Sequence, residues 1–238
     1  MKDQYFGDVN DFRKYGLLRA LTLAGALRLG VCWMLTAEDS RTDGQFLRYL
    51  EDSKEFRGKD PELFDWLKHT IEVEKVRHVA RIEKSNLLGN SFFHSQMLTD
   101  CEHARREYFT ASRAALAGCD LVFFDPDNGI EIKSRPVGRK DSSKHLYWDE
   151  VSRTFEAGSS VLIYQHFIRE NRAQFSARIS EDLQKKTGAA AVFSFSTPYA
   201  LFVLASQERH VALFAGKLQR IGEVWGKHIK VGAHPGAH

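Results

Sequence analysis

The pattern of apolar and polar positions divides the chain into short apolar runs separated by longer amphipathic stretches. The run 121–124 is wholly apolar and contains β-branched and aromatic side chains, which is typical of a strand buried on both faces of a parallel sheet. Further runs lie at 30–35 and 160–164, and two more at 191–195 and 200–205 flank a turn. The last two predict an antiparallel hairpin near the carboxyl end.

Amphipathic stretches between these runs predict helices. The first follows Asp8 and Asn10, either of which suits a helix N-cap. Others cover about 99–117, 148–157 and 170–186. Because helices alternate with buried strands, we expect an α/β fold with a mostly parallel sheet, a carboxyl-terminal antiparallel hairpin and a single domain over residues 1–238. The charged stretch of about 45–90 is expected to form a helical insertion, and the basic, glycine-containing tail to fray.

Composition narrows the class of protein only a little. The 238 residues include 34 Lys plus Arg and 31 Asp plus Glu, and this balance neither requires nor opposes a nucleic-acid partner. The three cysteines are widely spaced and form no Cys-x-x-Cys pair, which predicts reduced thiols and no zinc site. No apolar signal core begins the sequence and no apolar run is long enough to span a bilayer, so we expect a cytoplasmic protein.

Polarity reverses sharply where the 121–124 run ends. The next residues, Asp125 to Gly129, form a turn sequence that places two carboxylates and an amide at the carboxyl edge of the sheet. Ligands bind at that edge in open α/β sheets, and two neighbouring acids are costly there unless they are used or well solvated. We therefore expect catalysis by Asp125, Asp127 and Asn128, with an ordinary Asx-rich turn as the alternative.

Three other stretches offer candidate chemistry. The loop Thr36 to Gly44 follows a predicted strand, but it lacks the Gly-x-Gly-x-x-Gly fingerprint of a dinucleotide site. His166 ends the 160–164 run and is a secondary candidate at the same edge. The loop 132–145 is basic, which suits either a phosphate backbone or plain solvation. Its candidate nucleic-acid contacts are Lys133, Arg135, Arg139, Lys140 and Lys144.

Two segments carry a resemblance to a known family. Residues 5–15 read Tyr-Phe-Gly-Asp-Val-Asn-Asp-Phe-Arg-Lys-Tyr, and residues 125–128 read Asp-Pro-Asp-Asn. With the α/β pattern, they resemble S-adenosylmethionine-dependent methyltransferases, and most of all the RlmJ-type 23S ribosomal RNA adenine methyltransferases. The family's opening His-Ala-Gly-Asn-x-Ala-Asp-Val-Leu-Lys-His matches residues 5–15 without a gap and keeps Gly7, Asp11 and Lys14. Its Asp-Pro-Pro-Tyr motif falls on residues 125–128, where Asp127 and Asn128 replace Pro and Tyr.

The resemblance implies a Rossmann-like methyltransferase fold and S-adenosylmethionine as cofactor. It also implies direct methyl transfer to a nucleic-acid nitrogen, with Asp125 orienting the acceptor and with no metal. The implied cofactor residues are Gly7, Asp8, Asp11, Lys14, Tyr15, Thr36 and Glu38.

Two alternatives come from other classes of function. Asp125 and Asp127, with Glu131 or His166, supply the carboxylates that a magnesium-dependent phosphoesterase or nuclease requires. A strand that ends in Asp-x-Asp is also similar to the first motif of haloacid-dehalogenase-like phosphatases, although that motif normally lies near the amino terminus of its core. The other alternative is a catalytically silent binding module that retains the fold.

Overall fold

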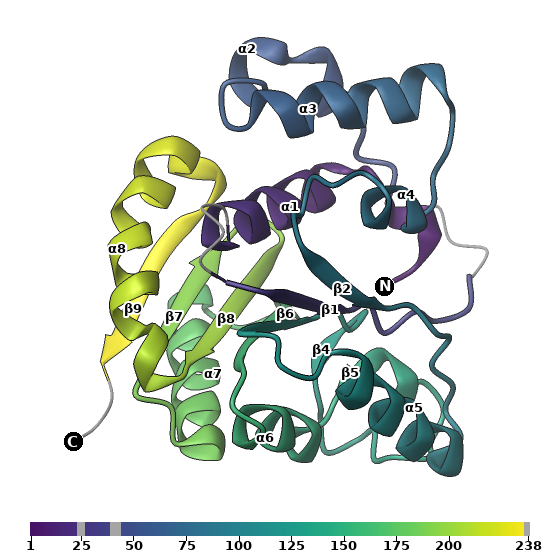
Figure 1. Cartoon of the computed structure of the whole chain (residues 1–238), viewed down its shortest axis with the longest axis vertical. Coiled ribbons are helices and arrows are strands. Elements are labelled where there is room, and N and C mark those ends of the chain that lie inside the picture. The colour runs from purple at the N-terminus through teal and green to yellow at the C-terminus, as the bar shows by residue number, and fades with distance from the viewer. Residues whose placement is uncertain (23–26, 39–43, 236–238) are drawn as a thin grey trace.

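A seven-stranded sheet is the centre of the computed structural model, which describes residues 1–22, 27–38 and 44–235 (Figure 1). In spatial order its strands are β2 (Ser91–His94), β1 (Leu29–Cys32), β3 (Leu121–Phe124), β6 (Ser160–His166), β8 (Ala200–Ser206), β7 (Ala191–Ser196) and β9 (Lys230–Pro235). Strands β2, β1, β3 and β6 pair in parallel, whereas β8 is antiparallel to both β6 and β7. The α/β class and the mostly parallel sheet are therefore as predicted.

The antiparallel part of the sheet is larger than expected. The β7–β8 hairpin lies where the sequence predicts it, but the chain then continues through α8 (Glu208–Trp225) and returns as β9. Strand β9 pairs with β7 from Lys230 opposite Ser196 to Pro235 opposite Ala191. The prediction that the basic tail from Lys227 onward frays is therefore wrong for residues 227–235, while residues 236–238 lie outside the described residues.

Side chains of β3 show why the sheet is buried on both faces. Leu121 and Phe123 belong to one hydrophobic cluster, while Val122 and Phe124 belong to another. Successive residues of a strand point to opposite faces, so a wholly apolar run requires cover on both sides. Helices α1 (Val9–Thr22) and α8 lie on one side of the sheet, and α5 (Glu102–Ala115), α6 (Trp148–Glu156) and α7 (Arg172–Thr187) on the other (Figure 1).

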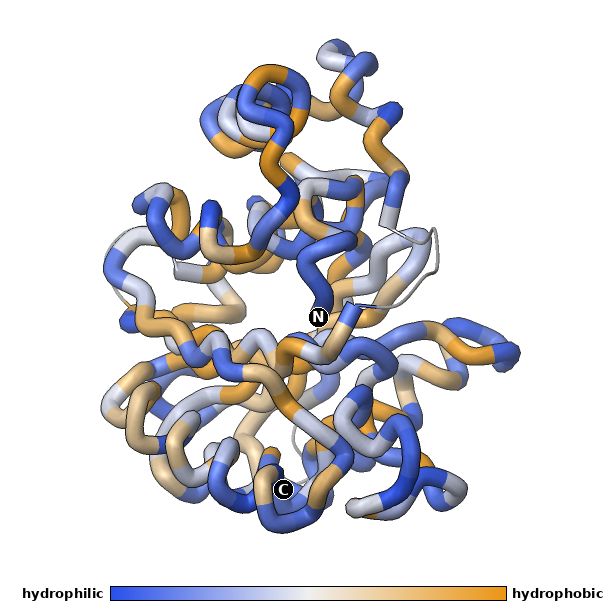
Figure 2. Tube along the Cα trace, turned by 90° about the vertical axis from the view of Figure 1, so that its right-hand side faces the viewer, coloured by the Kyte–Doolittle hydropathy of each residue, from blue (hydrophilic) through white to orange (hydrophobic). Residues whose placement is uncertain are grey.

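Between β1 and β2 the chain forms a cover of short helices over α1. They are η2 (Arg48–Glu51), α2 (Ser53–Phe56), α3 (Pro61–Lys68), the π-helix η3 (His69–Val73) and α4 (Ala80–Glu83). Asp60 begins α3 by accepting a hydrogen bond from the Leu63 amide, and Pro61 occupies the first turn. Figure 2 shows the mixed character of this region at the top of the molecule, where hydrophilic and hydrophobic segments alternate.

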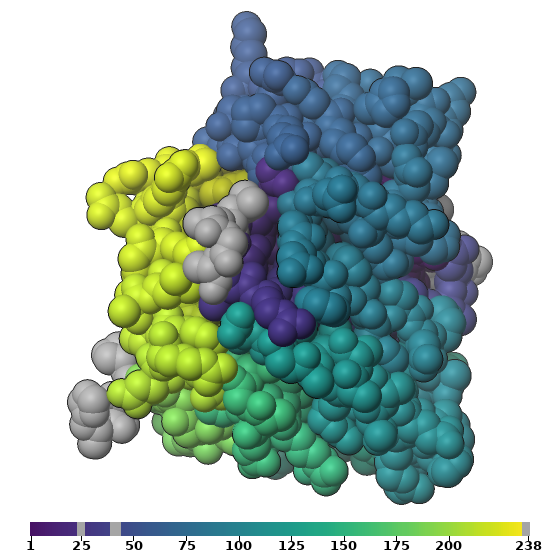
Figure 3. Space-filling model, in the orientation of Figure 1, coloured from purple at the N-terminus to yellow at the C-terminus, as the bar shows by residue number. Residues whose placement is uncertain are grey.

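Helix α1 is enclosed on almost every side. Phe12 packs against Tyr49 and Phe64 from the helical cover and against Trp225 from α8. Trp225 also packs directly on Gly16, where an added Cβ would overlap the indole ring. Only a little of the purple amino-terminal segment reaches the face seen in Figure 3. This enclosure holds the polar residues of α1 in fixed positions at the edge of the sheet.

None of the described helices is long and apolar enough to cross a membrane. Cys32, Cys101 and Cys119 are all described residues and carry free thiols, and Cys32 and Cys119 are buried.

Candidate functional site

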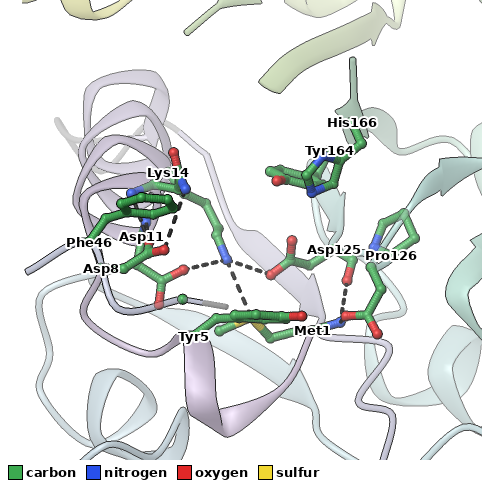
Figure 4. A pocket seen from close by; sticks show the side chains of 13 residues that line it. Met1, Tyr5, Asp8, Asp11, Lys14, Phe46, Asp125, Pro126, Tyr164 and His166 are labelled. Atoms are coloured by element: carbon green, nitrogen blue, oxygen red, sulfur yellow. Dashed lines mark hydrogen bonds and ion pairs between the residues drawn. The ribbon is translucent and has the colours of Figure 1, made fainter. Parts of the chain in front are cut away.

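A pocket of about 300 Å³ opens at the carboxyl ends of β3 and β6, beside the start of α1 (Figure 4). Its lining comes from residues 1–14, 44–46, 125–127 and 164–166. Two predicted stretches, the amino-terminal segment and the acidic turn, thus meet in one cavity. This is the edge of the sheet where α/β proteins bind their ligands.

A buried ion-pair network forms the floor of the pocket. The Nζ atom of Lys14 lies 2.7 Å from Oδ1 of Asp11 and 2.6 Å from Oδ2 of Asp125. Lys14 and Asp125 are each only 3% exposed and are 111 residues apart in the chain. An ammonium group removed from water is tolerated when carboxylates surround it, and the rings of Trp33 and Tyr164 lie 5.7 and 6.0 Å from Nζ.

The start of α1 holds this network in place. Asp8 caps the helix, since its Oδ1 accepts hydrogen bonds from the Asn10 and Asp11 amides at 2.8 and 3.0 Å. Oδ2 of Asp11 accepts hydrogen bonds from the Gly7 amide and the Tyr15 hydroxyl. Residues three and four positions apart share a helix face, which explains why residues 11, 14 and 15 act together.

Asp127 faces a different cation. Its Oδ1 lies 2.7 Å from the α-ammonium group of Met1, and its Oδ2 accepts a hydrogen bond from the Thr36 hydroxyl at 2.6 Å. The same ammonium group donates a hydrogen bond to the backbone oxygen of Asp125 at 3.0 Å. Within residues 1–22, 27–38 and 44–235, no three His, Cys, Asp or Glu side chains are grouped so as to hold a metal ion.

Burial and neighbouring charges shift the pKa values of these groups. Burial, reinforced by the charge of Asp11, raises the pKa of Asp8 to about 6. Burial also raises the pKa of Asp125, and the cations of Lys14 and Met1 offset this only in part. Burial lowers the pKa of Lys14, but Asp11 and Asp125 outweigh it and raise that pKa above its ordinary value. The lining includes four carboxyl groups, from Asp8, Asp11, Asp125 and Asp127, against the ammonium groups of Lys14 and Met1, which favours a ligand with a positively charged part.

Comparisons with known proteins leave the chain without a family. No family model matches it, and no curated protein matches it. One solved structure that matches is that of a Legionella pneumophila protein assigned to the family DUF519. The two share 10% identity and a TM-score of 0.47 over 98% of this chain and 97% of the other. A likeness at this level carries no argument about function.

Other predicted cofactor residues lie outside the pocket lining. Gly7 adopts φ +80°, and its backbone oxygen accepts a hydrogen bond from the Tyr49 hydroxyl. Tyr15 is buried and holds Asp11, while Thr36 is buried and holds Asp127. These three residues therefore support the pocket from behind. Glu38 is exposed and does not line the pocket, and residues 39–43 of the same loop lie outside the described residues.

Asn128, predicted to act with the two acids, is turned toward another part of the molecule. Its Nδ2 lies 3.3 Å from Nε2 of His145, and its backbone oxygen accepts a hydrogen bond from Gln165. The cause is local, because the next residues form β4 (Gly129–Ile130), which pairs with β5 (His145–Leu146). Asn128 is thus held near β5 and does not line the pocket.

The predicted basic loop is anchored apart from the pocket lining. Arg105 on α5 is buried, binds Glu150 with two nitrogens and donates hydrogen bonds to the backbone oxygens of Ser142 and His145. Lys144 forms an ion pair with Asp141 at 2.9 Å. The other four predicted contacts are exposed: Lys133, Arg135, Arg139 and Lys140.

Sequence reasoning did not predict the aromatic residues that line the pocket. Tyr5, Phe46 and Tyr164 all line the pocket, as does the exposed secondary candidate His166. Phe46 stacks on Tyr199 with ring centroids 5.6 Å apart and planes 16° from parallel. The two side chains are 54% and 44% exposed, which is unusual for large aromatic residues. Tyr5 begins the 5–15 segment and Tyr164 ends the 160–164 run, but neither was predicted to line the site. Among 17 Phe and 7 Tyr, no sequence signal marked Phe46.

Proposed function

We propose that this chain is an S-adenosylmethionine-dependent methyltransferase that acts on a nucleic-acid nitrogen. The contact between Lys14 and Asp125 is the observation that carries the proposal. It joins the two segments that resemble the RlmJ-type family, although they are 111 residues apart. The parallel body of the sheet and its antiparallel β7–β8 hairpin also agree with the methyltransferase fold that the resemblance implies.

The charge of the pocket fits this cofactor. S-adenosylmethionine has two cationic parts, its sulfonium and its amino group, and it supplies an activated methyl group when bound. Asp8 and Asp11 at the start of α1 would bind the cationic parts, because the lining has an excess of carboxylates. The rings of Tyr5 and Tyr164 form apolar walls that exclude water from the reacting atoms.

Asp125 is the residue that would act on the methyl acceptor. A carboxylate at this position accepts a hydrogen bond from an amine and so orients the nitrogen lone pair. Lys14 fixes the carboxylate through the 2.6 Å contact, so its position is set before a ligand arrives. Burial raises the pKa of Asp125, which also makes this group a better acceptor for the proton that the amine loses.

The magnesium alternative has less support from the geometry. A divalent ion held by Asp125 and Asp127 requires both carboxylates to converge on one point. Instead, Asp125 contacts Lys14 at 2.6 Å, while Asp127 contacts the Met1 ammonium group at 2.7 Å. Two ammonium groups therefore take the contacts that a metal ion would need.

Isothermal titration with S-adenosylhomocysteine tests the proposal. We expect micromolar binding to the native protein and at least tenfold weaker binding to Lys14→Met. The double variant Lys14→Met with Asp125→Asn removes one of the two carboxylates that lose their cation in Lys14→Met, and circular dichroism of both variants shows whether any loss of binding comes from misfolding. Lys68→Met is the matched control, because Lys68 binds the Leu50 oxygen and Glu72 within the helical cover and does not line the pocket.

Two results would contradict the methyltransferase proposal. One is no S-adenosylhomocysteine binding to a folded native protein. The other is binding of magnesium alone that disappears in Asp127→Asn, which would favour phosphoester chemistry. Cofactor binding without methyl transfer to any RNA or DNA pool would instead indicate the silent binding module.

A further inference from the structure

A second cavity, which the proposed methyl transfer does not use, carries the opposite charge. This groove of about 620 Å³ lies between α7 and the β7–β9 edge of the sheet. Arg172, Lys227 and Lys230 line it, and none of its described lining residues is acidic. We propose that the groove binds the phosphate backbone of single-stranded nucleic acid and directs a base toward the pocket. The inference deepens the proposed function and rests on it for the link to methyl transfer.

The three cations of the groove are available to phosphate groups. Arg172 is exposed, and its guanidinium lies 4.8 Å from the ring centroid of Phe167, which orients its plane. Lys230 is exposed at the start of β9. Lys227 is 74% exposed, and its ion pair with Glu55 at 3.2 Å is open to water and therefore weak. Exposed cations bind phosphates by releasing counterions, without the cost of a buried charge.

Polar groups of β7 extend this lining toward the sheet edge. Ser196 at the end of β7 lines the groove together with Ser176 of α7. Hydroxyl groups of this kind donate hydrogen bonds to phosphate oxygens and sugars without reading the base. The groove thus has the chemistry of a backbone-binding surface.

The exposed aromatic pair connects the groove to the pocket. Phe46 lines the pocket, and its partner Tyr199 directly follows Pro198, which lines the groove. The guanidinium of Arg13 lies 5.7 Å from the Tyr199 ring centroid. Single-strand binding proteins combine a basic groove with aromatic rings on which bases stack. The order of basic groove, aromatic pair and acidic pocket therefore matches a strand whose leading base approaches Asp125.

The aromatic pair of Phe46 and Tyr199 also supplies the stacking ring that the acidic turn lacks. Asn128 stands where the family motif has an aromatic ring, and it is held near His145. Phe46 and Tyr199 offer a stacking surface from a different part of the chain. The predicted basic loop has cations, but it lines neither this groove nor the pocket.

Fluorescence anisotropy with a labelled, single-stranded uridine oligonucleotide tests the inference. The double variant Arg172→Ala with Lys230→Ala should bind at least tenfold more weakly and show a salt dependence reduced by about one to two units of slope. Tyr199→Ala should weaken binding by about tenfold through loss of stacking. The control Lys133→Ala with Arg139→Ala removes the same charge from the exposed basic loop and should change binding by less than about threefold.

Several outcomes overturn the inference. The first is the absence of oligonucleotide binding. The second is a control variant that loses as much affinity as the groove variant. The third is full affinity in Tyr199→Ala together with equal competition by polyglutamate. The last would indicate an acidic peptide as the ligand. S-adenosylhomocysteine titration of the same variants separates the two proposals, because groove variants should retain cofactor binding. Failure of cofactor binding with intact groove dependence refutes only the methyltransferase.

Discussion

Replacing Asp8 with Asn should stabilise the protein at neutral pH. The folded-state pKa of Asp8 is about 6, against an ordinary value of 3.8, because the carboxylate is buried beside Asp11. A pKa raised by folding means that the folded state holds the proton more tightly than the unfolded state. The contribution of this proton to stability is full below about pH 4 and is lost as the pH rises through about 6. About two pKa units correspond to roughly 3 kcal/mol at most.

Asp8→Asn removes this buried charge and keeps the helix cap, because Asn and Asp cap helices about equally well. Urea denaturation at several pH values between 4 and 8 measures the free energy of unfolding of both proteins. We expect a difference near zero at pH 4 that grows to about 1–3 kcal/mol in favour of the variant by pH 7.5. Asp52→Asn, which changes the exposed cap of α2, should give no such trend. A constant difference across this range, or a variant less stable than the native protein at pH 7.5, would refute the reasoning.

Two further changes test the packing of the fold. Gly16→Ala should lower the free energy of unfolding by about 1–3 kcal/mol, because the new Cβ meets Trp225. Gly216→Ala should raise it by about 0.5–1 kcal/mol, because no atom lies within 4 Å of the added Cβ and alanine favours a helix over glycine. Thermal unfolding measures both changes. Glu150→Gln leaves the buried guanidinium of Arg105 without its carboxylate, so we expect a loss of about 3–5 kcal/mol in urea titrations and faster proteolysis of the basic loop. Unchanged stability in that variant would show that the pair does not anchor the loop.

The strands that sequence reasoning found and missed differ in their place in the sheet. Runs such as 121–124 lie inside the sheet and are apolar throughout, since both faces are covered. Within the seven-stranded sheet, the two strands that it missed, β2 and β9, are the two edges. Ser91–His94 is largely half-buried, and Lys230–Pro235 contains Lys, Gly, His and Pro, so neither shows a strong apolar pattern. Edge strands carry such residues because they must resist further pairing.

In the candidate site, too, some residues could be predicted from the sequence and others could not. Lys14 and Asp125 were both named from the sequence, Asp125 from the acidic turn that ends a buried strand and Lys14 through the resemblance. No spacing rule predicts their contact, because they are 111 positions apart. The placement of Asn128 depended on the pairing of β4 with β5, a contact between two-residue strands that leaves little pattern. Phe46 became notable only when the fold placed it against Tyr199. Sequence reasoning therefore missed the residues whose place in the site depends on tertiary contacts alone.

The wide spread of the pocket lining has a consequence for synthesis of the protein. The lining begins in residues 1–14 and ends at His166, with the acidic turn between them. A nascent chain that emerges from the ribosome must therefore extend past residue 166 before the cavity can close. Strand β6 gains its second neighbour only after β8 has also been made. During translation, the ligand can thus bind and stabilise only those chains that have already formed most of the sheet.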